Sequence, residues 1–231
     1  MIKKIFFFAF LFNSFLTVAW TQNFFSTSGK TITGADGKPF LIRGTNLGNW
    51  LVPEGYMFKF KDASSPRLIN QTFTELVGEV EAKAFWKKFL DAYVTAEDIH
   101  YLKAIGMNSI RIPFNYRMFT NENYLSDNDA SRGFKYLDRL LGWCKKENLY
   151  VLLDMHCAPG GQTGDNIDDS FGYPYLFEST ENRKQCADIW RSIAEHYKNE
   201  KIIYHRLNAV YLCLQFRTGT NRFRIFLIKH F

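Results

Sequence analysis

Short apolar runs alternate with longer amphipathic segments along this chain, and that alternation constrains its fold more than any other feature. Three runs read as β-strands, Phe40–Asn46, Asn108–Pro113 and Tyr150–Asp154, and Lys201–Ile203 could open a fourth. Apolar residues at helical spacing fill the intervals between these runs. Strands that alternate with helices of this length predict βα units on a parallel sheet, which is an α/β fold.

Signals typical of helix ends support the prediction that the segments between the strands are helices. We expect a loop-rich stretch through Pro53 and Pro66, followed by a helical region from about Glu79. Thr95–Asp98 has the form of a capping box that begins the next helix, and Gly106 stands where that helix would stop.

The remaining local predictions follow in the same way. A helix carrying Leu137 to Cys144 is expected to close near Glu147–Asn148, and another is expected around Ile189 to Tyr197. Upstream of the first strand, Thr31–Pro39 contains turn residues and predicts a turn or small hairpin. The sequence also predicts that Pro113 ends its strand.

Polar residues stand at the carboxyl end of each predicted strand. Asn46 ends the first strand and Glu54 follows it, Arg111 lies near the end of the second, and Asp154 ends the third with His156 just beyond it. In parallel α/β folds, the carboxyl ends of the strands meet at one edge, where ligands bind. We therefore expect these side chains to converge on a single pocket.

The N-terminus has the pattern of a secretory signal peptide. Met1–Lys4 is positively charged, Ile5–Val18 is a short apolar run, and Ala19 and Thr21 supply small residues near a cleavage point. We expect residues 1–21 to be removed, leaving a secreted, periplasmic or extracellular protein with no stable membrane span.

The positive charge of the chain is confined to its last stretch. The formal net charge is +6, yet residues 201–231 contain six Lys or Arg and no Asp or Glu, while the other 200 residues hold 23 basic and 23 acidic side chains. A nucleic-acid-binding face would be a basic patch on the fold. The charge pattern therefore does not predict a nucleic-acid partner.

Four cysteines are widely separated along the chain, at Cys144, Cys157, Cys186 and Cys213. There is no Cys-x-x-Cys pair, so zinc-ribbon spacing is absent. An exported protein permits a disulfide, but the sequence does not choose a pairing.

Three motifs in order carry a resemblance to a known family. They are Arg43-Gly-Thr-Asn-Leu-Gly-Asn-Trp-Leu-Val-Pro-Glu54, Ser109-Ile-Arg-Ile-Pro113 and Leu153-Asp-Met-His-Cys-Ala-Pro-Gly-Gly-Gln162. Together they resemble glycoside hydrolase family 5, the cellulase-like family of (β/α)₈ barrels, and most of all its exo-β-1,3-glucanase-like branch. The resemblance covers roughly Thr31 to Ile203. It implies a partial TIM (β/α)₈ barrel, about the first four βα units, with β-glucan oligo- or polysaccharides as partners and no metal or cofactor.

The resemblance also implies roles for individual residues. Arg111 matches the arginine beside the family's nucleophile carboxylate, where a guanidinium keeps a carboxylate ionised. His156 matches a histidine that hydrogen-bonds sugar hydroxyls, and Glu54 matches a glutamate that contacts the terminal sugar. Trp50 and Tyr56 could add aromatic surface for a pyranose ring, on chemistry and proximity alone, with core packing the alternative for Trp50.

Two further residues need separate treatment. Asp154 is expected to be a hydrogen-bonded structural carboxylate and not a catalyst. Asn208 aligns with the asparagine of the family's Asn-Glu-Pro motif and is a candidate sugar ligand.

The sequence departs from the family after Ile203. Family members retain configuration with two glutamates, one of them in the Asn-Glu-Pro motif on the fourth strand. Here Ala209 and Val210 follow Asn208, and neither catalytic glutamate has a counterpart. We interpret 22–203 as the N-terminal part of the hydrolase domain and 204–231 as an aberrant basic tail from a frameshift, a truncation or a degraded pseudogene. We therefore expect the chain to be catalytically inactive.

Three alternatives remain beside this reading. A secreted carbohydrate-binding protein would keep the sugar contacts without catalysis. A metal-dependent phosphoesterase would use Asp154-x-His156 and Gly164–Asp168, although these motifs lie too close together and the companion Gly-Asn-His segment is missing. The run Phe223–Lys229 could form a basic membrane-surface peptide.

Overall fold

Three parallel strands form the central sheet of the structure, a computed structural model that describes residues 25–34 and 36–203. Their spatial order follows the sequence: β3 (Gly44–Asn46), β4 (Ser109–Asn115) and β5 (Tyr150–Cys157). A parallel bridge joins Val151 to Ile203, where the fourth strand was predicted. The parallel α/β architecture predicted from the sequence is therefore confirmed.

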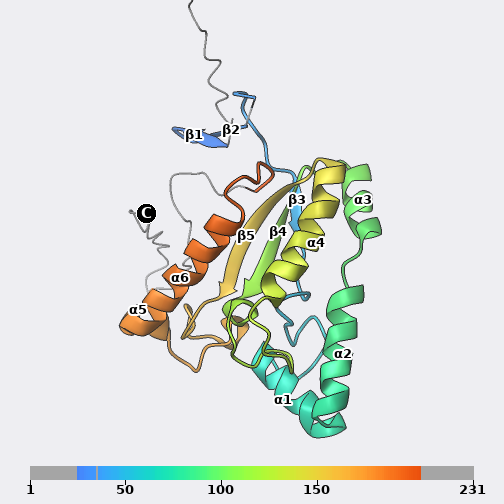
Figure 1. Cartoon of the computed structure of the whole chain (residues 1–231), viewed down its shortest axis with the longest axis vertical. Coiled ribbons are helices and arrows are strands. Elements are labelled where there is room, and N and C mark those ends of the chain that lie inside the picture. Colours follow the sequence, from blue (N-terminus) through green and yellow to red (C-terminus); the bar gives the residue numbers. More distant parts are fainter. Residues whose placement is uncertain (1–24, 35, 204–231) are drawn as a thin grey trace, which may run out of the picture.

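Helices occupy every interval between the strands. Helices α1 (Pro66–Val77), α2 (Glu79–Ala92) and α3 (Ala96–Ala104) connect β3 to β4, and α4 (Arg132–Glu147) connects β4 to β5. Beyond β5 come α5 (Tyr175–Glu178) and α6 (Thr180–His196). In Figure 1, α4 runs alongside β4 and β5, with α3 beyond it on one side and α6 on the other. Short 3-10 helices, η1 (Tyr116–Phe119) and η2 (Asn166–Asp168), follow β4 and β5.

The predicted helix ends are confirmed. Helix α2 begins at Glu79, and Thr95 and Asp98 form a complete capping box at the start of α3. Gly106 has a positive φ just after α3, and Asn148 adopts the left-handed conformation that closes α4.

Helix α1 was missed, because the stretch around Pro66 was expected to be a loop. Only Pro66 and Ile69 of this helix are buried, and the proline was taken as a loop residue although it lies in the first helical turn. Its N-terminal signal is clear in retrospect: Ser65 caps the helix by accepting from the Leu68 amide, and Pro66 occupies the first turn.

The first strand is shorter than predicted. Leu41 and Ile42 are 75% and 49% exposed and precede the strand, which covers only Gly44–Asn46. The Asn108 side chain holds this extended lead-in by accepting from the Arg43 amide and donating to the Leu41 carbonyl. At Gly44, β3 approaches β4 so closely that a Cβ would lie 2.3 Å from the Ser109 carbonyl oxygen.

The second and third strands are longer than predicted. Strand β4 continues past Pro113 to Asn115, and β5 continues past Asp154 to Cys157. Pairing with β3 stops at Arg111, so Pro113 lies where β4 has a partner on one side only, and a proline is tolerated there. Consequently, Asp154 lies inside the strand and does not end it, and His156 belongs to the strand and does not follow it.

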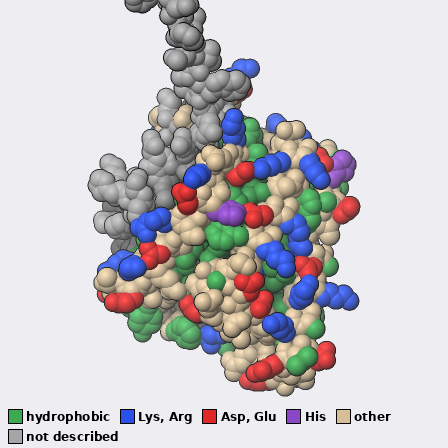
Figure 2. Space-filling view, in the orientation of Figure 1, with side chains coloured by type: hydrophobic (Ala, Val, Ile, Leu, Met, Phe, Trp, Pro, Cys, Tyr) green, Lys and Arg blue, Asp and Glu red, His purple; other side chains and the backbone are tan. Residues whose placement is uncertain are grey.

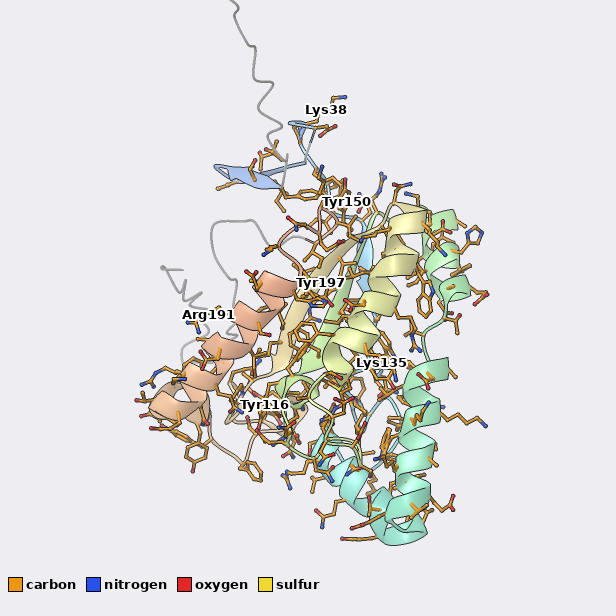
Figure 3. The ribbon with its side chains drawn as sticks, in the orientation of Figure 1. Lys38, Tyr116, Lys135, Tyr150, Arg191 and Tyr197 are labelled. Carbon is orange, nitrogen blue, oxygen red and sulfur yellow. The ribbon has the colours of Figure 1, made fainter. Side chains whose placement is uncertain are left out.

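An antiparallel hairpin lies at the N-terminal end of the sheet (Figure 1), formed by β1 (Ser26–Ser28) and β2 (Thr31–Thr33). It starts earlier than the predicted Thr31–Pro39 hairpin, although the turn at Gly34–Lys38 and a Thr33–Pro39 bridge are present as expected. The rings of Phe25, Phe40 and Tyr150 meet edge to face near this hairpin, with centroids 4.6 to 5.3 Å apart. Figure 3 places Tyr150 at this end, and Tyr116 beyond the other end of the strands.

The core lies between the sheet and the helices. On β4 it takes Ile110, Ile112 and Phe114, all fully buried, and on β5 it takes Val151 and Met155. Leu137, Leu140 and Cys144 of α4 belong to the same cluster. Cys157 and Cys186 are also buried as free thiols, while Cys213 lies outside the described residues.

Candidate functional site

The candidate site lies on the sheet face opposite the helices. Along β4 and β5 the apolar core residues alternate with a second set that faces the other way. The register sets Asn46, Arg111 and Leu152 in one row and pairs Pro113 with Asp154. Parallel neighbours in a row point to the same side of a sheet, and so do residues two apart on one strand. Arg111 and Asp154 therefore share this face and lie toward the carboxyl end of the strands.

Arg111, Asp154 and His156 form a compact polar cluster on this face. Arg111 Nη2 is 2.5 Å from Asp154 Oδ2, and His156 Nδ1 is 3.0 Å from the same oxygen. Arg111 Nη2 also lies 3.2 Å from His156 Nδ1. The Asp154 carboxylate is buried, whereas the arginine and histidine side chains are partly exposed. The Arg111 guanidinium and the His156 imidazole are therefore accessible to solvent, and the buried Asp154 carboxylate supports both.

The geometry of this cluster constrains the imidazole. A carboxylate oxygen only accepts hydrogen bonds, so Asp154 Oδ2 is best satisfied when both Arg111 and His156 donate to it. With the proton on Nδ1, the 3.2 Å contact between Arg111 Nη2 and Nδ1 joins two donors and is not a hydrogen bond, and Nε2 is the ring nitrogen that can face a ligand. Asp154 is thus hydrogen-bonded on both sides within the cluster, and its structural role stays a prediction.

Glu54 adds a buried carboxylate to the same site. It is 5% exposed, its backbone amide donates to Asn49 Oδ1 at 3.0 Å, and its Oε2 has no hydrogen-bond partner among residues 25–34 and 36–203. Burial raises the pKa of Glu54, while the nearby charge of His156, a hydrogen bond from Tyr56 and the charge of Arg111 oppose that rise. Glu54, Arg111 and His156 are therefore within electrostatic reach of one another, and the structure brings all three together.

The two aromatic candidates separate in the structure. Tyr56 is 66% exposed beside Glu54, so its ring remains available to a ligand. Trp50 is completely buried, its Nε1 donates to the Leu90 carbonyl at 2.9 Å, and its ring packs against Tyr136. Of the two alternatives for Trp50, the structure shows core packing and not an exposed sugar platform, because its ring and its polar atom are already used inside the core.

The loop after β5 contains polar residues whose role the sequence reading missed. Gln162 and Asp168 are almost fully buried. The Gln162 side chain bonds to backbone groups of Met155, His156 and Ala158, and Asp168 accepts from backbone amides of the loop. Buried polar side chains in a loop that follows a site strand are the signal that could have drawn attention to them. Asn208, the remaining candidate ligand, lies outside the described residues.

The metal-binding alternative is poorly matched by the geometry. Within the described residues, no group of three or more His, Cys, Asp or Glu side chains is arranged to hold a metal ion. Arg111 sits directly against Asp154 and His156, where its positive charge would repel a divalent cation. Asp168 accepts hydrogen bonds from the amides of Gln162 and Thr163.

Surface properties add two observations. Figure 2 shows basic and acidic side chains interspersed over the visible face. Among helices in the described part of the chain, none combines the length and apolar character needed to cross a bilayer.

Comparison with known proteins agrees with this architecture. The family description "Cellulase (glycosyl hydrolase family 5)" matches residues 70–208, more than half of the chain. The chain belongs to glycosyl hydrolase family 5. Its three parallel strands and the bridge at Ile203 accordingly form the beginning of a (β/α)₈ barrel, as the sequence predicted.

Curated relatives carry different names for their activities. A β-xylosidase of Phanerodontia chrysosporium is 32% identical over 191 residues, covering 80% of this chain and 39% of that protein. Endoglucanase C of Acetivibrio thermocellus is 36% identical over 130 residues, covering 55% and 36% of the two chains. A probable glucan 1,3-β-glucosidase A of Aspergillus fumigatus is 29% identical over 173 residues, covering 74% and 41%. The chain thus spans about two fifths of the length of these relatives.

A solved structure supports the fold. The crystal structure of rutinosidase from Aspergillus niger is similar with a TM-score of 0.59 and 21% sequence identity, over 71% of this chain and 47% of that one. At this identity the likeness establishes the fold alone.

Proposed function

We propose that this chain is the N-terminal part of a secreted glycoside hydrolase directed at β-glucans, and that it supplies the sugar-binding side of the site. The observation that carries the proposal is that Arg111 and His156 are in contact at the carboxyl ends of the strands and that Glu54 lies within electrostatic reach of both. A carboxylate, a guanidinium and an imidazole are the hydrogen-bonding groups that suit a ring of sugar hydroxyls. Membership of family 5 supports the same substrate class.

Each residue has a distinct part in the proposal. The orphaned Glu54 Oε2 accepts from a sugar hydroxyl, and His156 Nε2 meets a neighbouring one. Arg111 holds a positive charge where a nucleophile carboxylate of the parent enzyme would need to stay ionised. The exposed Tyr56 ring offers an apolar surface to a pyranose. Asn208 and secretion through residues 1–21 stay predictions.

The residues after Asn208 differ from the family's acid/base motif. A retaining mechanism uses two carboxylates, one as nucleophile and one as acid/base, about 5 Å apart. Ala209 and Val210 follow Asn208 where the family's acid/base glutamate and its proline would stand. Asp154 is committed to Arg111 and His156, so it is not a substitute. We propose that the chain binds glucan oligosaccharides without hydrolysing them.

Calorimetric titration with laminaritriose, cellotriose and glucose tests the binding proposal. We expect at least one trisaccharide to bind the purified chain, and His156→Gln to weaken that binding at least tenfold. His100→Gln is the matched control, because His100 is exposed on α3 and pairs with Glu147 away from the site. Unchanged binding by His156→Gln, or no binding by the wild-type chain, would refute the sugar site.

A reducing-sugar assay tests the proposed lack of catalysis separately. Laminarin and carboxymethylcellulose are incubated with the purified chain, and we expect no product above a protein-free blank. Turnover that is lost in the His156→Gln variant would show that the chain is an enzyme. Binding without turnover is also what a dedicated carbohydrate-binding protein would give.

A further inference from the structure

His156 lies at a β-bulge, and this position requires support from outside the sheet. Phe114 pairs with Met155, and the next residue, Asn115, pairs with Cys157, so His156 is the extra residue of β5. A bulge leaves the inserted residue outside the regular ladder and re-aims its side chain. The backbone of His156 therefore lacks the pairing with β4 that would otherwise fix the direction of the imidazole.

The side chain of Gln162 takes the place of the missing ladder bonds. Gln162 Nε2 donates to the carbonyl of His156 at 2.8 Å and to that of Met155 at 3.2 Å. Gln162 Oε1 accepts from the amide of Ala158 at 2.8 Å. One buried amide group thus bonds to the backbone on both sides of the bulge and within it.

Asp168 in turn fixes the backbone of Gln162. Its Oδ2 accepts from the amides of Gln162 and Thr163 at 2.8 and 2.6 Å, and its Oδ1 accepts from the amide and hydroxyl of Ser170. Gly161 allows this packing, because a Cβ there would lie 1.8 Å from Ser170 Oγ. Since four donors converge on one buried carboxylate, Gln162 is held in a single position.

We propose that Gln162 is a positioning residue that sets the orientation of the His156 imidazole, and that Asp168 holds Gln162 in place. The proposal rests on the proposed function for what the imidazole binds, but the support of the bulge does not depend on a ligand. Gln162 acts through hydrogen bonds to the backbone, so it need not touch a sugar. This role distinguishes it from Asp154, which contacts the imidazole directly.

The variant Gln162→Leu removes all three hydrogen bonds at similar side-chain size. Long-range ¹H–¹⁵N spectra report the tautomer of the His156 ring, whose signals are assigned by their loss in His156→Gln. We expect Gln162→Leu to reduce the Nδ1-protonated population and to weaken trisaccharide binding about tenfold, the size of effect that partners orienting metal-bound histidines have on metal affinity.

A stability effect alone would overturn the proposal. If Gln162→Leu lowers the melting temperature while the His156 spectra and sugar affinity of the folded protein stay at wild-type values, Gln162 only supports the loop. Gln71→Leu is the matched control, because Gln71 is exposed on α1 and bonds only to Glu75. It should leave the His156 signals unchanged.

A milder variant covers the case in which Gln162→Leu does not fold. Ser170→Ala removes one of the four donors to Asp168 and keeps the backbone bonds, so it should shift the His156 signals in the same direction by a smaller amount. No shift in that variant would contradict the proposal. If the wild-type chain binds no sugar, the proposed function fails, whereas the NMR comparison still decides the role of Gln162.

Discussion

The two faces of β4 and β5 show how the same strands serve two different environments. Ile110, Ile112 and Phe114 point toward the helices and are fully buried, while Ser109, Arg111 and Pro113 alternate with them and point the other way. The helix-facing set is uniformly apolar, and the opposite set includes a charged residue that pairs across to Asp154. One short sequence thus encodes a packing surface and a polar site in alternate positions.

On β4, the residues that face the helices should determine stability, and those on the opposite face should determine binding. A substitution on the helix-facing side should lower the free energy of unfolding and leave the polar cluster unchanged. A substitution on the opposite side should alter the polar cluster at a smaller cost in stability. Four predictions test this division.

Ile112→Ala should have the largest effect on stability. Ile112 is completely buried in the core, so its loss removes apolar contacts and leaves a cavity, at a cost of about 3–4 kcal/mol. Urea denaturation measures the change, and Ile112→Val should cost about 1 kcal/mol. A cost below about 1.5 kcal/mol for the alanine variant would show that the described core is looser than its burial indicates.

Asp154→Ala should lower the free energy of unfolding by less, about 2 kcal/mol, because it leaves the positive charge of Arg111 without its partner carboxylate. Removing one partner of a fully buried pair costs more, but the Arg111 side chain is 31% exposed and water can partly replace the carboxylate. The same variant should abolish trisaccharide binding, since both Arg111 and His156 lose their common acceptor. Asp154→Asn is the shape-matched control, and we expect it to fall between wild type and alanine in both measurements.

Glu54→Gln should stabilise the chain at neutral pH by on the order of 1 kcal/mol, while weakening sugar binding. Burial raises the pKa of Glu54 above its ordinary value of 4.5, so the native state binds this proton more tightly than the unfolded state. The contribution of Glu54 to stability is therefore complete below pH 4.5 and is lost as pH rises through the native pKa.

Melting curves between pH 4 and pH 8 check this sign. The advantage of Glu54→Gln over wild type should be largest at the upper end of that range and should disappear at its lower end. An advantage that grows toward acid pH would contradict the raised pKa.

Leu152→Thr should have the smallest effect, within about 0.5 kcal/mol. Leu152 is 39% exposed on the same face as Arg111, so a shorter polar side chain loses little apolar burial, and threonine suits a strand. Chemical denaturation beside Ile112→Val gives the comparison between the two faces directly. A cost as large as that of Ile112→Val would mean that the polar face also carries packing energy.

The sequence predicted the elements whose signals are local and repeated. The capping box at Thr95, the end of α4 near Asn148 and the presence and order of three parallel strands agree with the structure, although the strand bounds differ. The position of Arg111, Asp154 and His156 near strand ends also placed them on one face. These features follow from periodicity and from short-range hydrogen bonds, so they can be read from neighbouring residues.

The features that were missed depend on contacts between distant segments. The end of β4 depends on where β3 stops pairing, and the burial of Trp50 depends on the Leu90 carbonyl on α2. Helix α1 was missed because Pro66 was taken as a loop residue, although Ser65–Pro66 is a helix-start signal. Gln162 acts by filling hydrogen bonds that a bulge leaves open, and nothing in the order of residues reveals that bulge.

The bulge at His156 separates the regular alternation of side chains along β5 from the residues that follow it. Upstream of it, adding or deleting one residue would exchange core and solvent positions along the whole strand. At the bulge, the offset between Phe114–Met155 and Asn115–Cys157 has already absorbed one insertion without disturbing the pairs before it. Residues can therefore be added or exchanged after this point, at the end of the barrel strands, without changing which side chains of β5 face the core.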